Sequence, residues 1–320
     1  MPQQDHYVSQ TYLRSFINED GYLTPYYKHG EIVIGKPKSP KSVCKEEDGD
    51  LNSYFKDPRI LDDYLKLFEN DWTKHVSALG NLESDFDTKY GIAGYISFLR
   101  ACTPTAKRLG QGILAETIQP VADKIISESV NDPDAPPEIK ELYEKRGIDN
   151  FYKLEVDREY AHARAISGLV GAAHRLFCSD WLVLKNETGM PFVTSDNPAV
   201  LYHRPEFSNT ASTFIPLAPN LAVLITPDPS KDAPTLEEME KFTHENDRFA
   251  DIKEEYVPKF NELVVKSAER LVLSSGAFDW LEEMVRENKS WRVQTVTNKI
   301  PLENGVLILH RQMAVNGKKA

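Results

Sequence analysis

The chain of 320 residues contains little cysteine and no long apolar segment. Its three cysteines, Cys44, Cys102 and Cys178, lie far apart and form no C-x-x-C pair. This number and spacing argue against a disulfide framework and a cysteine zinc site, and they favour a reducing compartment. The longest uncharged apolar stretch, residues 165–173, is far too short to span a bilayer, and no basic segment followed by an apolar one opens the chain. The sequence therefore predicts a cytoplasmic protein with no membrane segment.

Positive charge is also in deficit. The chain has 38 Lys and Arg residues against 49 Asp and Glu residues, which gives a formal net charge of −11. Nonspecific binding to nucleic acid depends on basic groups that release counterions from phosphate, so this balance disfavours it. The sequence identifies no other partner. An apolar fraction of 41%, with 14 Phe and 14 Tyr residues, is sufficient for a globular core.

The motifs of several common enzyme classes are missing. The chain has no G-x-S-x-G turn for a nucleophilic serine, no glycine-rich loop that would hold phosphates, and no H-E-x-x-H zinc helix. A G-x-G-x-x-G segment after a strand is absent as well. These absences count against the common hydrolase, kinase and dehydrogenase families.

The spacing of apolar residues divides the first half of the chain into two regions. In residues 1–57, a short helix precedes two short runs around Lys28 to Gly30 that are typical of a β-hairpin, with Pro25 suggesting an edge position. Residues 58–177 show helical periods throughout. Helices are expected near residues 90–101, 106–130 and 152–177.

Residues 178–320 contain short runs of Val, Ile, Leu and Phe separated by Asn, Gly and Pro, which predict a mainly antiparallel sheet. Two helices are expected near 235–250 and 253–273, followed by closing strands at 291–297 and 305–311. We therefore expect an α+β fold, in which a helix-rich lobe packs against the sheet and an N-terminal β-hairpin precedes both. The whole chain, residues 1–320, is expected to form a single compact domain.

Polar residues at two places are candidates for a functional site. Asp196 and Asn197 directly follow a strand-like run, where Asp196 would be a metal ligand or an acid/base group and Asn197 would orient a substrate or water. The same residues are also typical of a turn that bonds its own backbone. His6, Gln10 and Arg14 are one helical turn apart and would share a polar face, although a structural histidine is the simpler reading.

One further pattern, Glu159 and His162, has the E-x-x-H spacing of carboxylate-bridged metal sites in helical bundles. Such sites need a second copy of the motif, and the chain has none. The pair is therefore interpreted as ordinary surface helix.

Several of these motifs together are similar to those of one family. They are HYVSQTYLRSF at 6–16, SVCKEEDGDLNSYF at 42–55, FLRACTPTAKR at 98–108, WLVLKNETGMPFVTSDNP at 181–198, FIPLAP at 214–219 and FNELVVKSAERLVLSS at 260–275. The chain resembles domain-of-unknown-function family 4238 from about Gln3 to Ser275, with these motifs in the family's order. Ser9 departs from the proline that is typical there, and Arg100 is separated from Thr103 by two residues. The resemblance implies no reaction and no cofactor.

The motif residues are polar but have apolar neighbours: His6, Gln10, Glu46, Glu47, Arg100, Asp196, Asn197 and Asn261. Burying such groups is costly unless they are paired or used. The first hypothesis is a divalent-metal-dependent hydrolase, with phosphodiesters as one substrate class. In it, Asp196 and Glu47 bind the metal, His6 acts as acid or base with Gln10 and Asn197 beside the substrate, and Arg100 stabilises negative charge.

The alternative hypothesis is a non-catalytic ligand-binding or sensing protein, in which the same residues form a structural polar network. The two hypotheses differ in one structural feature. A catalytic site requires Asp196 to meet another carboxylate or His6 in an open pocket, whereas a structural Asp196 would accept hydrogen bonds from backbone amides in a closed turn.

Overall fold

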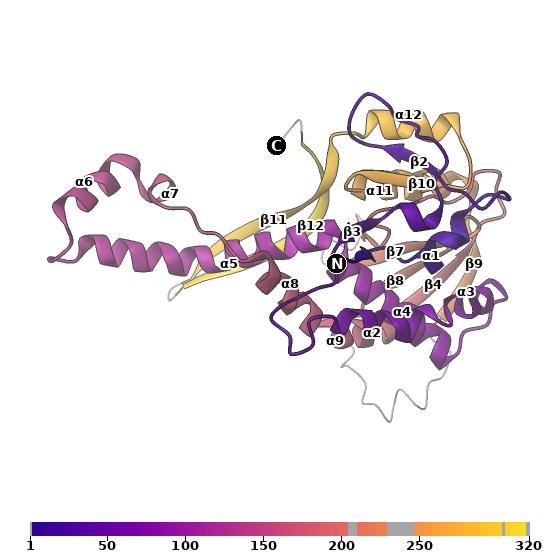
Figure 1. Cartoon of the computed structure of the whole chain (residues 1–320), viewed down its shortest axis with the longest axis horizontal. Helices are drawn as coiled ribbons and strands as arrows, with labels where there is room; N and C mark the ends of the chain where they lie inside the picture. The colour runs from indigo at the N-terminus through magenta and orange to yellow at the C-terminus, as the bar shows by residue number, and fades with distance from the viewer. Residues whose placement is uncertain (1, 204–209, 229–246, 303–304, 318–320) are drawn as a thin grey trace.

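The computed structural model describes residues 2–203, 210–228, 247–302 and 305–317. Figure 1 shows a rounded body and a long projection that leaves it on one side. The projection, called the arm from here on, consists of helices α5 to α7 and of strands β11 and β12, which run beside α5 (Figure 1).

The central region is helical, as its apolar periodicity predicts. Its helices are α2 (Ile60–Glu69), α3 (Trp72–Gly80), α4 (Phe86–Cys102), α5 (Pro104–Asn131), α6 (Pro137–Arg146), α7 (Ile148–Phe151), α8 (Arg158–Ser167) and α9 (Leu169–Phe177). Local sequence sets the breaks between them. Thr103 caps α5 by accepting a hydrogen bond from the Ala106 amide, and Pro104 suits the first helical position. The helix expected at 152–177 begins only at Arg158 and is split in two at Gly168.

The main sheet has five strands in the order β6-β7-β8-β4-β9. They are β4 (Asp180–Lys185), β6 (Val200–His203), β7 (Ala211–Ala218), β8 (Leu221–Thr226) and β9 (Asp247–Asp251). All pairs are antiparallel except β4 with β9. Successive side chains alternate between two hydrophobic clusters: Ile215 and Val223 pack with α4 and α9, while Phe214 and Leu224 pack with the C-terminal helices. The sheet is therefore buried on both faces.

Smaller elements surround this sheet. Helix α1 (Gln10–Leu13) continues into the 3-10 turn η1 (Arg14–Phe16), and further turns are η2 (Pro40–Ser42) and η4 (Glu254–Tyr256). Strands β1 (Gln4–His6) and β3 (Lys45–Glu47) form one pair, β11 (Trp291–Leu302) and β12 (Gly305–Asn316) another. A three-stranded sheet has the order β2 (Thr24–Tyr27), β10 (Leu271–Ser274) and β5 (Thr194–Ser195). The C-terminal helices are α11 (Val257–Ser267) and α12 (Asp279–Glu287).

The structure confirms the predicted α+β fold, with a helical central region and mainly antiparallel sheets. The expected N-terminal hairpin is reduced to two isolated bridges, Leu23 with Lys38 and Tyr26 with Ile34. Strand β2 instead pairs along its full length with β10, because β10 is a fully buried apolar strand from the other end of the chain. The single-domain organisation stays a prediction. No helix in the described ranges is both long and apolar enough to cross a membrane.

Two predicted C-terminal helices need correction. Most of the helix expected at 235–250 lies outside the described residues, and residues 247–250 belong to strand β9. The helix expected at 253–273 is too long, since α11 ends at Ser267 and strand β10 begins at Leu271. The amides of Glu269, Arg270 and Leu271 are bonded to the Asp196 carboxylate, so they make no helical hydrogen bonds.

Candidate metal centre

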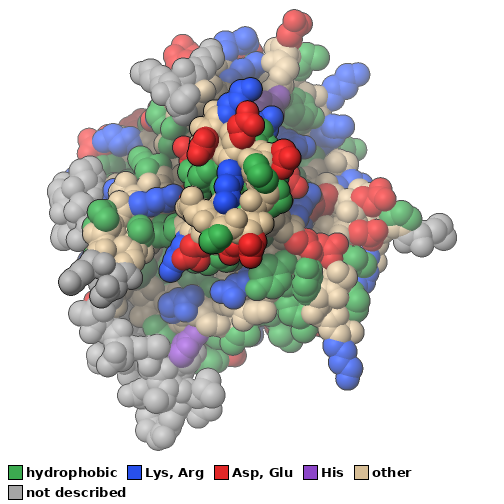
Figure 2. Space-filling model, turned by 90° about the vertical axis from the view of Figure 1, so that its left-hand side faces the viewer, with side chains coloured by type: hydrophobic (Ala, Val, Ile, Leu, Met, Phe, Trp, Pro, Cys, Tyr) green, Lys and Arg blue, Asp and Glu red, His purple; other side chains and the backbone are tan. Residues whose placement is uncertain are grey.

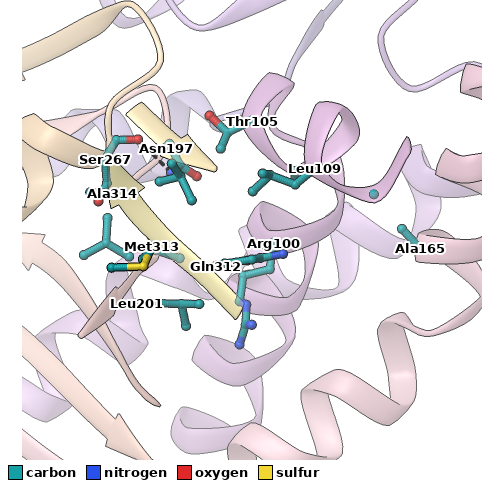
Figure 3. Close-up of a pocket in the computed structure, with 15 residues that line it drawn as sticks. Arg100, Thr105, Leu109, Ala165, Asn197, Leu201, Ser267, Gln312, Met313 and Ala314 are labelled. Carbon is teal, nitrogen blue, oxygen red and sulfur yellow. Dashed lines mark hydrogen bonds between the residues drawn. The ribbon is translucent and has the colours of Figure 1, made fainter. Parts of the chain in front are cut away.

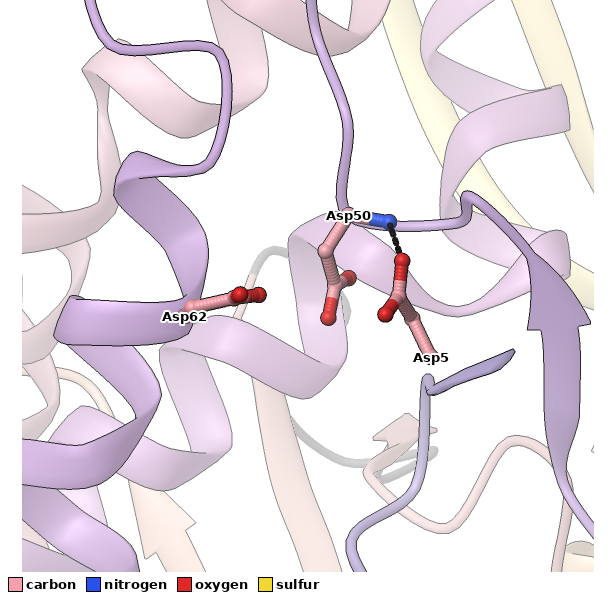
Figure 4. A group of neighbouring side chains, drawn as sticks. All are labelled: Asp5, Asp50 and Asp62. Atoms are coloured by element: carbon pink, nitrogen blue, oxygen red, sulfur yellow. Dashed lines mark hydrogen bonds between the residues drawn. The ribbon is translucent and has the colours of Figure 1, made fainter. Parts of the chain in front are cut away.

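Three aspartates from separate segments meet near the N-terminus. Strand β1 pairs with β3, which places Asp5 opposite Glu46. The turn after β3 then brings Asp50 back to β1, where its amide donates to Oδ2 of Asp5 at 3.2 Å. Asp62 lies in the first turn of α2. One carboxylate oxygen from each of the three lies within 4.8 Å of the others, and Figure 4 shows the side chains directed toward one another.

The cluster is largely withdrawn from solvent. Asp5 and Asp50 are 5% and 4% exposed, and Asp62 is partly buried. Oδ1 of Asp50 meets no hydrogen-bond partner in the part of the chain that the structure describes. Burial raises the pKa of Asp50 to about 7, aided by the charges of Asp5 and Asp62 and opposed by Lys107. Burial and Asp5 also raise the pKa of Asp62.

Two cations, Arg59 and Lys107, lie beside the cluster but donate no hydrogen bond to the Asp50 carboxylate. Arg59 donates to both carboxylate oxygens of Asp5, at 3.3 and 3.2 Å, and to Asp48 at 2.7 Å. Its Nη1 is 3.9 Å from Oδ2 of Asp62. Lys107 donates to the Gly49 carbonyl at 2.7 Å and to Glu46. Arg59 therefore neutralises mainly Asp5, and the oxygen of Asp50 remains the unsatisfied group of the cluster.

An open pocket of about 370 Å³ adjoins the aspartates, and His6 and Gln10 line it together with Arg14, Lys66 and Glu69. The structure thus brings two of the predicted site residues together. Nε2 of His6 lies 3.2 Å from the Lys41 carbonyl. A carbonyl only accepts, so Nε2 carries the proton and Nδ1 keeps its lone pair. Burial lowers the pKa of His6 from its ordinary value, which favours the neutral ring.

The donor set defines the kind of ion that the cluster suits. Three carboxylates without sulfur or nitrogen favour a hard cation such as Mg²⁺, Mn²⁺ or Ca²⁺ over Zn²⁺ or Cu²⁺. Ligand oxygens at about 2.1–2.4 Å from an ion lie at most about 4.2–4.8 Å from one another. The three carboxylate oxygens lie within 4.8 Å of one another, which is the upper end of this range.

Asp196 lies elsewhere, in the turn after β5. Its carboxylate accepts hydrogen bonds from the amides of Glu269, Arg270 and Leu271 at 2.8–3.0 Å, and the residue is 2% exposed. Burial raises its pKa to about 6, although these three amides oppose the shift. The side chain of Glu269 in turn binds Arg108 of α5 at 2.7 Å. This closed turn is what the structural hypothesis expects for Asp196.

Arg100 and Asn197 line a second pocket, of about 150 Å³, between α4, α5 and strand β12 (Figure 3). Asn197 is buried there and donates to the Ser267 carbonyl at 3.0 Å. Arg100 is exposed to solvent, and its Nη1 lies 3.4 Å from Oγ1 of Thr213. The structure therefore separates these two residues from His6 and Gln10.

Glu47 is exposed and lines a third pocket together with Glu159 and His162. Glu159 accepts a hydrogen bond from the Ser53 amide at 3.2 Å. Burial and the charges of Lys107 and Arg158 lower the pKa of His162 to about 3. Among the described residues, the E-x-x-H pair belongs to no group with metal-binding geometry.

Sequence reasoning did not select Asp5, Asp50 or Asp62. Asp5 precedes the predicted His6, and Asp50 lies in the motif segment at 42–55, whose predicted polar residues are Glu46 and Glu47. A signal was present, because the segment EEDGD places acidic residues around a turn-forming glycine. Its meaning depends on the pairing of β1 with β3 and on the docking of α2, which are long-range contacts.

Comparison with known proteins gives one match. A family model described as "Protein of unknown function (DUF4238)" matches residues 4–277, and the chain therefore belongs to this family. None of the curated proteins and none of the solved structures compared matches the chain.

Proposed function

We propose that this member of the DUF4238 family is a divalent-metal-dependent hydrolase of phosphate esters, phosphodiesters among them, with Asp5, Asp50 and Asp62 as its metal ligands. The observation that carries the proposal is the buried, unpartnered Oδ1 of Asp50 within a cluster of three carboxylates. A divalent cation would satisfy this oxygen and offset the mutual repulsion of the three charges.

The pocket beside the cluster contains groups that hydrolysis requires. A metal ion held there would polarise a phosphoryl oxygen and lower the pKa of a bound water. Neutral His6 offers the lone pair of Nδ1 as a proton acceptor, and Gln10 is placed to hold the water or the substrate. Arg14 and Lys66, on the wall of the same pocket, supply positive charge for a phosphate group.

The site residues predicted from the sequence therefore fall into two groups, those that line the pocket at the cluster and those that do not. His6 and Gln10 keep their proposed catalytic roles, and the metal ligands change from Asp196 and Glu47 to the three aspartates. Arg100, Asn197, Asp196 and Glu47 have no part in the proposed reaction, because none of them lines the pocket at the cluster. The proposed location is the cytoplasm, which the free state of Cys44, Cys102 and Cys178 supports.

A second candidate function, non-catalytic ligand binding or sensing, is favoured by the Asp196 region. Three amides saturate Asp196, and Asn261 bonds both the Val193 amide at 3.1 Å and the Pro191 carbonyl at 2.9 Å. These contacts lock the turn after β5 against α11 and β10. Motif residues can thus be retained for structure alone.

The test is hydrolysis of bis(p-nitrophenyl) phosphate by chelator-treated protein after addition of Mn²⁺ or Mg²⁺. We expect activity with the metal, a loss of at least tenfold in Asp62→Asn, and wild-type activity in the matched control Asp63→Asn. Asp63 is the next residue of α2, is exposed, and pairs only with Lys66 among the described residues. Absence of metal-dependent hydrolysis, or equal activity in both variants, would favour the binding or sensing function.

A further inference from the structure

The arm exposes an unusual amount of apolar surface. Eleven of the 21 large hydrophobic side chains that are exposed in the described chain lie on it: Ile118, Val121, Ile125, Ile139, Val296, Ile300, Leu302, Val306, Leu307, Leu309 and Met313. Figure 2, which looks at the molecule from the far end of the arm, shows such side chains open to solvent among charged ones. Concentrated apolar exposure of this kind marks interaction surfaces on soluble proteins.

The hairpin of β11 and β12 carries apolar side chains on both faces. Its inner face includes buried Val293 and half-buried Ile308, and it also makes polar contacts with α5: Thr297 bonds Glu116, and His310 lies 3.1 Å from Thr117. Its outer face carries six of the exposed residues, at even numbers in β11 and odd numbers in β12: Val296, Ile300, Leu302, Leu307, Leu309 and Met313. The inner face is already covered by α5 and α11, and the open face of an antiparallel ribbon is normally polar. The outer face therefore has the composition of a buried surface.

The register makes this face continuous. Ile300 lies opposite Leu307, and Asn298 lies opposite Leu309 on the same side of the ribbon. The six apolar side chains are 38–58% exposed. At about 80 Å² each they offer ~500 Å², and the exposed parts of Gln294, Asn298 and Arg311 bring the face near the ~800 Å² that each partner buries in a standard interface.

Charge on this face is sparse. The face carries Arg292 and Arg311 and no acidic side chain among its described residues. Anionic vesicles are therefore the competing occupant, and the apolar area and self-complementarity of the face favour a second copy of the chain. A second copy of the chain brings an identical apolar face, and a two-fold contact would bury both faces at once.

We propose that two copies of this chain associate through their arms, with the outer faces of the two β11–β12 hairpins packed against each other. The proposal concerns the arm alone and holds whether or not the aspartate cluster binds metal.

The test is sedimentation velocity of the full chain from about 1 to 100 μM. We expect the wild type to approach twice its mass of 36.4 kDa as concentration rises. Ile300→Glu with Leu307→Glu, a facing pair, should remain monomeric throughout. The control Ile32→Glu changes an apolar residue that is 71% exposed on the body, and it should associate as the wild type does. Leu309→Gln, a milder change on the same face, should weaken association at least tenfold if the double variant does not fold.

A wild type that stays monomeric up to 100 μM overturns the proposal, as does a folded double variant that still dimerises. Circular dichroism establishes folding of each variant. Flotation with phosphatidylcholine vesicles, with and without phosphatidylserine, covers the competing occupant. A monomeric wild type that binds vesicles through Ile300 and Leu307 would assign the face to lipid and likewise overturn self-association.

Discussion

Replacement of Asp50 by asparagine should stabilise the metal-free protein at neutral and higher pH. The folded state raises the pKa of Asp50 from its ordinary 3.8 to about 7, so the folded protein holds this proton more tightly than the unfolded chain does. Protonated Asp50 therefore contributes to the free energy of unfolding. This contribution is fully present below pH 3.8 and is lost as the pH rises through 7. Asparagine keeps a similar shape but never ionises, and it therefore escapes the loss.

The size of the effect follows from the same shift. A rise from 3.8 to about 7 corresponds to roughly 4 kcal/mol at about 1.4 kcal/mol per pH unit. The gap in unfolding free energy between Asp50→Asn and wild type should widen by up to this amount between pH 4 and pH 7.5, then level off. For a chain of this size, that equals a relative rise in Tm of about 6 °C.

Thermal melts of chelator-treated wild type and Asp50→Asn across this pH range provide the measurement, with Asp63→Asn as the control. Loss of the exposed contact between Asp63 and Lys66 should change Tm by about 1 °C or less, independently of pH. A gap between Asp50→Asn and wild type that stays constant from pH 4 to pH 7.5 would refute the reasoning. It would mean that the folded protein stabilises the carboxylate of Asp50 as well as water does in the unfolded chain.

Three further outcomes are expected. Mn²⁺ at a hundredfold excess over Kd should raise the unfolding free energy of wild type by about 2.7 kcal/mol in melts, and no such rise should occur in Asp50→Ala. Calorimetric titration should show metal affinity falling about tenfold per pH unit below 7, because Asp50 must release its proton; an affinity that is flat with pH would contradict this. Asp196→Ala leaves three amides without their acceptor and should lower stability by about 3 kcal/mol or more. Its Mn²⁺-induced rise in Tm should match that of wild type, and loss of that rise would return Asp196 to the metal site.

The sequence was most informative where structure is determined locally. The helical period of 58–177 involves neighbouring residues only, and it appears in the structure, where the helix expected at 106–130 is α5 (Pro104–Asn131). Strand β2 found a partner about 250 residues away, so a local hairpin pattern could not identify it. Likewise, residues 268–273 read as helix because their apolar spacing continues, whereas a hydrogen-bond acceptor distant in sequence, Asp196, draws their amides into β10.

The candidate site shows the same limit. His6 and Gln10 were selected because one helical turn would separate them. His6 instead lies in strand β1 and Gln10 begins α1, although both line one pocket. The metal ligands come from a strand, a turn and a helix start, and only the packed structure brings them within 4.8 Å. Asp196 was a strong candidate by position, but its three backbone partners lie some 75 residues later.

Helix α5 also has a mechanical consequence. It contains 28 residues, which at 1.5 Å per residue gives a length of about 42 Å, with Pro120 in its interior. At its base, Arg108 is fastened to Glu269, the residue whose amide Asp196 holds. A tilt of about 5° at this fastening would displace the tip by ~4 Å over such a length. The contact of Arg108 with Glu269 is therefore one of the contacts that fix the direction in which α5 leaves the body.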